Sequence, residues 1–220
     1  MLPMKAKYIC FEGTEGVGKT TQTQKLADYL KSKGYKVLQT KEPGTILSPL
    51  TMQLRGIMLD RQYDEQLTAP ARELISQAIR SIHLDKIVVP ALLECDFVIQ
   101  DRGILSGLAY ESACGNDLDR LISLSEYVTE NARMFLDDGI YDDIIYLKGD
   151  TSAGLKKALS AKKEFAAGDA MEAKGDSFLQ TVSSNMDELS QSFNTTTIEV
   201  DGKGIDEVFS EILRALNIEE

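Results

Sequence analysis

The sequence predicts an α/β fold in which a five-stranded parallel sheet is flanked by helices. Short apolar runs rich in β-branched residues alternate with longer stretches of helical periodicity, as in βαβ units. A glycine-rich segment with a phosphate-binding pattern separates the first apolar run from the first helical stretch. Chemically distinctive segments follow the apolar runs, and ligands bind where the carboxyl ends of parallel strands meet.

The elements follow from these patterns in chain order. Strands are predicted at residues 6–11, 36–40, 97–101, 143–148 and 196–200. Helices are predicted at residues 19–33, 48–59, 70–94, 104–113, 118–136, 152–163, 176–192 and 205–216. The first helix carries Leu26, Ala27 and Leu30 at helical spacing, and Gly34 is a natural stop for it. Residues 160–176 combine small residues with alternating charge and little apolar periodicity, which indicates a mobile segment.

The whole chain of 220 residues fits one domain, residues 1–220. No run approaches 18 apolar residues and the first residues lack a signal peptide's apolar core, so we expect no membrane segment. Three scattered cysteines suggest a reduced, cytoplasmic protein. The net charge of −11 argues against a nucleic-acid polymer as partner, but it leaves small-molecule nucleotides open.

The glycine-rich segment, residues 13–20, matches the phosphate-loop pattern G-x-x-x-x-G-K-[ST]. A strand that leads into such a turn and then a helix aims backbone N–H groups and the positive end of the helix dipole at one spot. The predicted fold is therefore the P-loop NTPase fold, and a plain glycine turn is the weaker interpretation. The residues predicted to bind the donor nucleotide are Gly13, Thr14, Gly16, Val17, Gly18, Lys19, Thr20 and Thr21.

Three segments resemble motifs of the thymidylate kinase family, within the nucleoside monophosphate kinases. They are Phe11-Glu12-Gly13 with the loop that follows, Thr40-Lys41-Glu42-Pro43-Gly44-Thr45, and the block from Asp101-Arg102 to Ala109-Tyr110. The resemblance runs in order from residue 6 to about residue 150. It implies a kinase that transfers the γ-phosphoryl group of ATP to dTMP for DNA precursor synthesis, with Mg²⁺. It also implies a homodimer and a lid at about residues 152–176.

The residues expected to form the catalytic centre are Lys19, Arg102, Glu15 and Asp101, with Thr20 and Asp101 as the metal-binding residues. Lys19 would contact the outer donor phosphates, and the Thr20 hydroxyl would hold Mg²⁺. By the resemblance, Arg102 would grip the acceptor phosphate, and Asp101 would orient Arg102 or bind the water shell of the metal. Glu15 is expected beside Mg²⁺ or Arg102, with an exposed loop acid as its alternative. For Asp101 and Arg102 the alternative, a surface ion pair, is disfavoured because they follow an apolar run.

The resemblance also implies an acceptor-binding set. Its members are Lys41, Arg55, Ser76, Arg80, Arg102, Ser106, Gly107 and Tyr110. Arg80 would donate to a carbonyl oxygen of the base, and Tyr110 would pack beneath the sugar and favour deoxyribose. Alternatives stay open: a solvated Lys41, a core Tyr110, and for Arg55 an exposed helix position, which is the favoured interpretation.

Three smaller expectations concern neighbouring residues. The Glu42-Pro43 bond is open to cis or trans, with trans commoner. Glu12 is expected to stiffen the junction of strand and loop. His83 is expected to be structural because phosphoryl transfer needs no histidine base.

The sequence departs from the family around the acceptor base. Ser76 stands where the family usually has a stacking phenylalanine, and losing a stacked ring costs about 1–3 kcal/mol per base. Gly107 replaces a larger polar residue, Glu111 a frequent glutamine, and Gly103 an aromatic residue or histidine. Another residue fills the gap, or the base is larger or modified.

The lid also departs from the family. Asp169-Ala170-Met171-Glu172 has alanine where the family signature has arginine. At least one of Lys157, Lys162 and Lys163 is predicted to reach the donor phosphates instead, although a solvated basic helix face is the more ordinary explanation.

Two alternatives to a thymidylate kinase remain at this point. One is a kinase for another or a modified deoxynucleoside monophosphate, for example a 5-modified dUMP. The other is a catalytically degenerate nucleotide-binding relative. A GTPase is disfavoured because the guanine-reading N-K-x-D string is absent.

Overall fold

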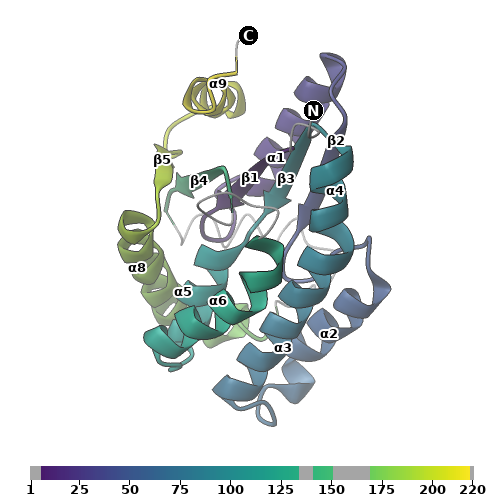
Figure 1. Cartoon of the computed structure of the whole chain (residues 1–220). Helices are drawn as coiled ribbons and strands as arrows, with labels where there is room; N and C mark the ends of the chain where they lie inside the picture. The colour runs from purple at the N-terminus through teal and green to yellow at the C-terminus, as the bar shows by residue number, and fades with distance from the viewer. Residues whose placement is uncertain (1–5, 134–140, 151–168, 219–220) are drawn as a thin grey trace.

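The protein has a central five-stranded sheet in which every pair of neighbouring strands is parallel (Figure 1). It was analysed as a computed structural model that describes residues 6–133, 141–150 and 169–218. The strand order is β2-β3-β1-β4-β5. The strands are β1 (Lys7–Glu12), β2 (Val37–Lys41), β3 (Phe97–Asp101), β4 (Asp143–Lys148) and β5 (Thr195–Glu199). The predicted five-stranded parallel sheet is confirmed, with each strand within one residue of its predicted place.

The helices also follow the predicted order. They are α1 (Lys19–Ser32), α2 (Pro49–Leu59), α3 (Ala69–His83), α4 (Val89–Glu94), α5 (Ile104–Ala113), α6 (Leu118–Arg133), α8 (Asp176–Ser192) and α9 (Ile205–Ala215). Short 3-10 turns lie at Arg61–Tyr63 and Glu172–Lys174. The predicted helix at 152–163, most of the lid and the three candidate lysines Lys157, Lys162 and Lys163 lie outside the described residues.

The long helix predicted at residues 70–94 is interrupted in the structure. A π-helix at Leu84–Val88 separates α3 from α4. Pro90 lies in the first turn of α4 and has no N–H to donate to the carbonyl one turn earlier, so regular α-helical bonding cannot run unbroken through this region. The spacing of apolar residues does not reveal the π-helix, because buried side chains continue from α3 through the π-helix into α4.

Helices cover both faces of the sheet. On one face α1 and α9 pack on Ile9, Phe11 and the neighbouring strands. On the other face α5, α6 and α8 pack against β4, and the π-helix with α4 packs on Tyr8 and Val98. Successive side chains of β1 therefore point into different cores, which explains why this strand is apolar along its whole length.

The register places the predicted site segments at one edge of the sheet. Phe11 pairs with Asp101, and Lys41 also pairs with Asp101. The phosphate loop after β1, the end of β2 and the end of β3 thus emerge side by side, as parallel strands require.

The described end of the predicted lid is packed against the body of the domain. Asp169, Ala170 and Met171 are buried, and the Ala170 N–H donates to Leu59 O at 2.9 Å. Asp169 Oδ1 accepts hydrogen bonds from the N–H groups of Met171 and Glu172 at 3.0 Å each. The sequence predicts a mobile segment at residues 160–176, but residues 169–172 in the described C-terminal part of this segment are buried and hydrogen-bonded. Within the described residues, no helix is both long and apolar enough to span a membrane.

Candidate active site

The phosphate loop requires glycine for two different reasons. A Cβ on Gly13 would lie 2.4 Å from the carbonyl oxygen of Leu147 on β4, so the loop passes too close to the sheet for any side chain. Gly18 is the N-cap of α1 and has φ 98°, a left-handed conformation that favours glycine. Because glycine has no side chain, no side-chain oxygen of the N-cap accepts from the first N–H groups of the helix. Those N–H groups are left to bind a ligand phosphate.

Lys19 is held inside the loop. Its side chain is buried, and Nζ donates to the Thr14 carbonyl oxygen at 2.5 Å. Burial and then the charge of Arg102 lower the pKa of Lys19 to about 8, although nearby carboxylates act in the opposite direction. A phosphate bound at this position would give the Lys19 ammonium a negatively charged partner and would raise the pKa of Lys19 again.

Thr20 and Asp101 lie together at the mouth of the loop. Thr20 Oγ1 donates to Asp101 Oδ2 at 2.6 Å. Asp101 Oδ1 is buried and has no hydrogen-bond partner among the described residues. An orphaned carboxylate oxygen beside a hydroxyl fits Mg²⁺, which prefers oxygen ligands. The two residues predicted for the metal are therefore brought together, and their chemistry suits that ion.

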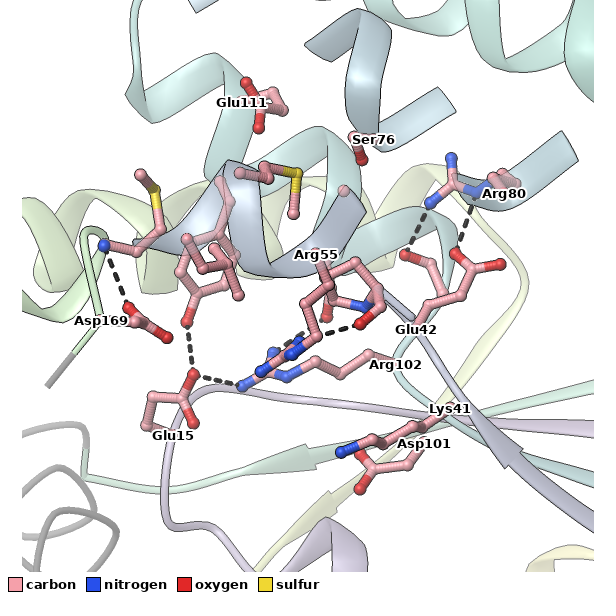
Figure 2. Close-up of a pocket in the computed structure, with 18 of the residues that line it drawn as sticks. Glu15, Lys41, Glu42, Arg55, Ser76, Arg80, Asp101, Arg102, Glu111 and Asp169 are labelled. Atoms are coloured by element: carbon pink, nitrogen blue, oxygen red, sulfur yellow. Dashed lines mark hydrogen bonds and ion pairs between the residues drawn. The ribbon is translucent and has the colours of Figure 1, made fainter. Parts of the chain in front are cut away.

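Arg102 joins the phosphate loop to the cavity (Figure 2). Its backbone is left-handed, with φ 67°, and its N–H donates to Phe11 O at 2.8 Å. Its guanidinium donates to Gly13 O at 3.0 Å and to Ser106 Oγ at 3.1 Å, and it pairs with Glu15 at 2.8 Å. Burial disfavours the charged guanidinium, but the nearby acidic groups, Glu15 first and then Asp101 and Glu12, together outweigh this and raise the pKa of Arg102. Glu15 thus contacts Arg102, as one of the two predicted placements required.

Glu12 fixes the start of α5 behind Arg102. Its carboxylate is fully buried and accepts hydrogen bonds from the N–H groups of Gly103 at 2.9 Å and Leu105 at 3.0 Å. It also contacts both the N–H and the hydroxyl of Ser106. The predicted stiffening role of Glu12 therefore has a definite form: the carboxylate satisfies the N–H groups at the first turn of a helix.

One large cavity adjoins the loop. It occupies about 1040 Å³, its open mouth included. Its lining includes residues from every predicted acceptor segment: Glu15, Thr20, Lys41, Arg55, Ser76, Arg80, Asp101, Arg102, Ser106, Gly107 and Tyr110. The polar and charged side chains that converge on its walls are typical of a small-molecule site.

Arg55 differs from the favoured sequence interpretation. It is half-buried and lines the cavity, with Nη1 donating to Pro43 O at 2.9 Å. The exposed helix position is therefore wrong, because Arg55 lies in the cavity wall against the Pro43 carbonyl oxygen. The Glu42-Pro43 peptide bond is cis. Tyr110 also lines the cavity, and its hydroxyl donates to Glu15 at 3.2 Å, so it is not only a core residue.

Arg80 is held in a buried polar network. Its Nε donates to Glu42 Oε2 at 3.0 Å, and its Nη2 donates to Gly103 O at 3.2 Å. His83 contacts the other Glu42 oxygen at 3.0 Å and Thr40 Oγ1 at 2.8 Å. Burial acts to raise the pKa of Glu42, but Arg80 and His83 outweigh it and lower that pKa to about 2. His83 has the structural role that was predicted, while the link from Glu42 to Arg80 was missed; the place of Glu42 at a strand end was its only signal.

Three apolar residues of the cavity were also missed. Met58 and Leu59 come from the end of α2, and Met171 comes from the described end of the predicted lid. No sequence signal separates them from ordinary core residues, because each is an apolar side chain at helical or irregular spacing. Together with Ser76 they line the cavity.

A phosphate loop, a paired hydroxyl and carboxylate, and an arginine that contacts both this loop and the adjoining cavity define a P-loop phosphotransferase. A family model described as thymidylate kinase matches residues 11–212. The chain belongs to the thymidylate kinase family, and it is a nucleoside monophosphate kinase that uses ATP as phosphoryl donor with Mg²⁺.

Named thymidylate kinases align with this chain over most of its length. A thymidylate kinase of Caldicellulosiruptor saccharolyticus is 30% identical over 216 residues, 97% of each chain. One of Thermosipho africanus is 33% identical over 209 residues, covering 93% of this chain and 94% of that one. The crystal structure of thymidylate kinase from Ehrlichia chaffeensis superposes with a TM-score of 0.70 at 25% identity, covering 97% of this chain and 99% of that one.

Proposed function

We propose that this kinase transfers the γ-phosphoryl group of ATP to the 5′-phosphate of dTMP, giving ADP and dTDP, through the residues assembled around Arg102. The observation that carries the proposal is that Arg102 contacts the phosphate loop through Gly13 O while it lines the acceptor cavity. A group in that position touches phosphates arriving from either side.

The donor side is the phosphate loop. Backbone N–H groups from Gly13 to Thr21 cradle the donor phosphates, and Lys19 exchanges its contact with Thr14 O for a phosphate oxygen. Thr20 and Asp101 would hold Mg²⁺, which neutralises charge on the β- and γ-phosphates when it is bound.

The acceptor phosphate lies between basic side chains of the cavity. Arg102 offers a planar fork, with Arg55 and Lys41 on neighbouring walls. An acceptor phosphate oxygen attacks the γ-phosphorus, the bond from that phosphorus to the bridging oxygen breaks, and ADP leaves with the electron pair. Catalysis then consists of holding two anions in line and stabilising the charge between them.

The nucleoside lies deeper in the cavity. Arg80 donates to a carbonyl oxygen of the base, and Tyr110 packs against the sugar, where its hydroxyl is already directed at Glu15. Ser76, Ser106 and Gly107 complete the walls on α3 and α5.

A coupled assay of ADP formation from ATP with dTMP tests the proposal. Arg102→Lys keeps the charge but loses the two-oxygen geometry, so kcat/KM is expected to fall about 100-fold or more. The exposed Lys36→Arg, far from the cavity lining, is the matched control and should behave as wild type. Nucleotide binding without ADP formation across a panel of monophosphates would contradict the proposal and favour a degenerate relative.

We further propose a cytoplasmic homodimer that binds no nucleic-acid polymer. Family analogy supports the dimer, and the three free cysteines and the acidic net charge support the rest. Light scattering after size exclusion should give twice the 24.3 kDa of one chain. A mass of one chain at micromolar concentration would contradict the dimer.

A further inference from the structure

The inner end of the acceptor cavity carries little side-chain volume. Ser76 on α3 and Gly107 on α5 both line it. Arg80 lies one helical turn beyond Ser76, and Glu111 lies one turn beyond Gly107, so each pair shares a helix face. Figure 2 shows Ser76 and Glu111 at the opposite end of the cavity from Glu15 and Asp101. This is the end that would enclose the base of a mononucleotide whose phosphate is near Arg102.

The apolar part of this end is lined by thioethers. Met58 and Met171 line the cavity and belong to one buried cluster. Methionine side chains are flexible and polarizable, they contact aromatic rings favourably, and they adjust to rings of different outline. The base is therefore enclosed by adaptable side chains in place of a fixed phenyl ring.

Glu111 is the polar group at this end. It is only 4% exposed and lines the cavity. Asn116 Nδ2 donates to Oε2 at 3.2 Å, and within the described part of the chain no hydrogen bond reaches Oε1. Burial and then the charge of Glu73 raise the pKa of Glu111 to about 8. No described protein group donates to Oε1, so this oxygen can accept a hydrogen bond from a donor on a ligand.

Thymine supplies no donor to such a group except at its ring nitrogen. Its one substituent besides the carbonyl oxygens is a methyl group. A hydroxyl or amino group on that methyl would add one donor and little volume. Glu111 offers an acceptor oxygen in either protonation state. The short side chain of Ser76 leaves space at this end of the cavity, whereas the Arg80 guanidinium occupies the space beside Gly107.

We propose that Glu111 is a specificity-determining residue and that the acceptor range extends to thymine-like deoxynucleoside monophosphates whose 5-methyl group carries a hydrogen-bond donor. The inference rests on the proposed function, because it assigns the base to the cavity that Arg102 opens on. Glu111 accepts the donor of the substituent through Oε1 while Asn116 holds Oε2.

The test compares 5-hydroxymethyl-dUMP with dTMP, two acceptors that differ by one oxygen atom. The ratio of their kcat/KM values in one enzyme preparation does not depend on the fraction that is folded. In the wild type, kcat/KM for 5-hydroxymethyl-dUMP divided by kcat/KM for dTMP is expected to exceed one. Glu111→Leu should lower this ratio about tenfold. Glu111→Gln, which keeps an acceptor oxygen, should restore most of it. With 5-aminomethyl-dUMP the wild type should exceed Glu111→Gln because only the carboxylate pairs with a cation.

Glu73→Gln is the matched control, since Glu73 is a buried carboxyl on α3 beside Glu111 that does not line the cavity. This variant should not lower the ratio. A wild-type ratio below one, or an unchanged ratio in Glu111→Leu, would overturn the inference while leaving dTMP turnover intact. Absence of turnover with dTMP and both analogues would instead overturn the proposed function, and this inference with it.

Discussion

Two glycines near the start of α5 leave room for side chains that arrive from distant parts of the chain. A Cβ on Gly107 would lie 2.8 Å from Arg80 Nη2, and one on Gly103 would lie 2.2 Å from the Tyr141 hydroxyl. Both glycines look like departures from the family motif when the sequence is read alone. In the structure the space beside Gly107 is occupied by Arg80 and the space beside Gly103 by Tyr141, so a larger residue at either position would clash with that side chain.

Gly107→Ala tests this pairing at the acceptor site. The new methyl group would displace the Arg80 guanidinium, which is buried and bonded to Gly103 O, so KM for dTMP should rise about tenfold. Thermal stability should hold or fall: alanine favours helix over glycine by about 1 kcal/mol, but the methyl group strains the buried contacts of Arg80 with Glu42 and Gly103. Steady-state kinetics and thermal unfolding measure the two effects.

Gly56→Ala is the control for that substitution. Gly56 lies in α2, and a Cβ there would meet no atom within 4 Å. It should gain stability with an unchanged KM. An unchanged KM in Gly107→Ala as well would show that Arg80 does not contact the acceptor.

The Lys19 ammonium gives a prediction of pH dependence. Its pKa of about 8 in the free enzyme means that the charge is lost as pH rises through 8, whereas bound phosphates keep it protonated. The Kd for ATP, measured by calorimetry without acceptor, should therefore rise about tenfold between pH 7 and pH 9. Lys19→Met should bind more weakly and lose this pH dependence. A wild-type Kd that is flat from pH 7 to 9 would refute the assignment.

At the scale of elements, α5 carries the acceptor site and Glu12 holds its first turn. The carboxylate of Glu12, at the end of β1, accepts hydrogen bonds from the N–H groups of Gly103, Leu105 and Ser106. The helix start is thereby fixed to the same strand that delivers the phosphate loop. Donor and acceptor sites keep their spacing because one buried side chain joins the elements that form them.

Glu12→Gln is expected to weaken that link. The amide would turn an NH₂ group toward backbone donors or Ser106, so the free energy of unfolding should fall by about 2 kcal/mol. Arg102 would shift with the helix start, and kcat should fall about tenfold or more at a temperature well below the unfolding midpoint. Chemical denaturation and kinetics provide the two measurements.

The exposed Glu207 gives a comparison for this loss. Its carboxylate accepts from the Gly204 N–H at 3.2 Å at the start of α9, in contact with solvent. Glu207→Gln should cost at most about 0.5 kcal/mol, because water replaces the lost contact. Equal costs in the two variants would show that burial of Glu12 adds nothing.

The charge of the whole molecule opposes the charge of its ligands. The chain carries −11 overall, yet Lys19, Lys41, Arg55 and Arg102 converge at one edge of the sheet. The tertiary structure thus gathers these four positive charges where phosphates bind, although the chain as a whole is acidic. An acidic surface repels nucleic acid and also repels itself.

Self-repulsion predicts that salt stabilises the fold. Raising NaCl from 10 to 200 mM at pH 7.5 should increase Tm by roughly 2–4 °C, which corresponds to about 1 kcal/mol for a domain of this size. At pH 5, close to the isoelectric point of about 4.7, the same change should have a much smaller effect. A Tm that falls with salt at pH 7.5 would show that specific ion pairs outweigh the net charge.

The amino-acid sequence alone determined the sheet, the order of its elements and the phosphate loop. These depend on local patterns: apolar runs such as Tyr8 to Phe11, glycines at required turns, and helical spacing after Lys19. The places of Asp101, Arg102 and Lys41 also followed, because the ends of parallel strands meet at one edge.

The tertiary structure alone decided which side chains meet in the acceptor cavity. The contact of Arg80 with Glu42 and the space at Gly107 join segments far apart in the chain, and no periodicity encodes such contacts. Met58 and Met171 read as core residues until folding brings them to a common wall. Sequence spacing fixes what one element presents, whereas the outline of a cavity depends on how several elements pack together.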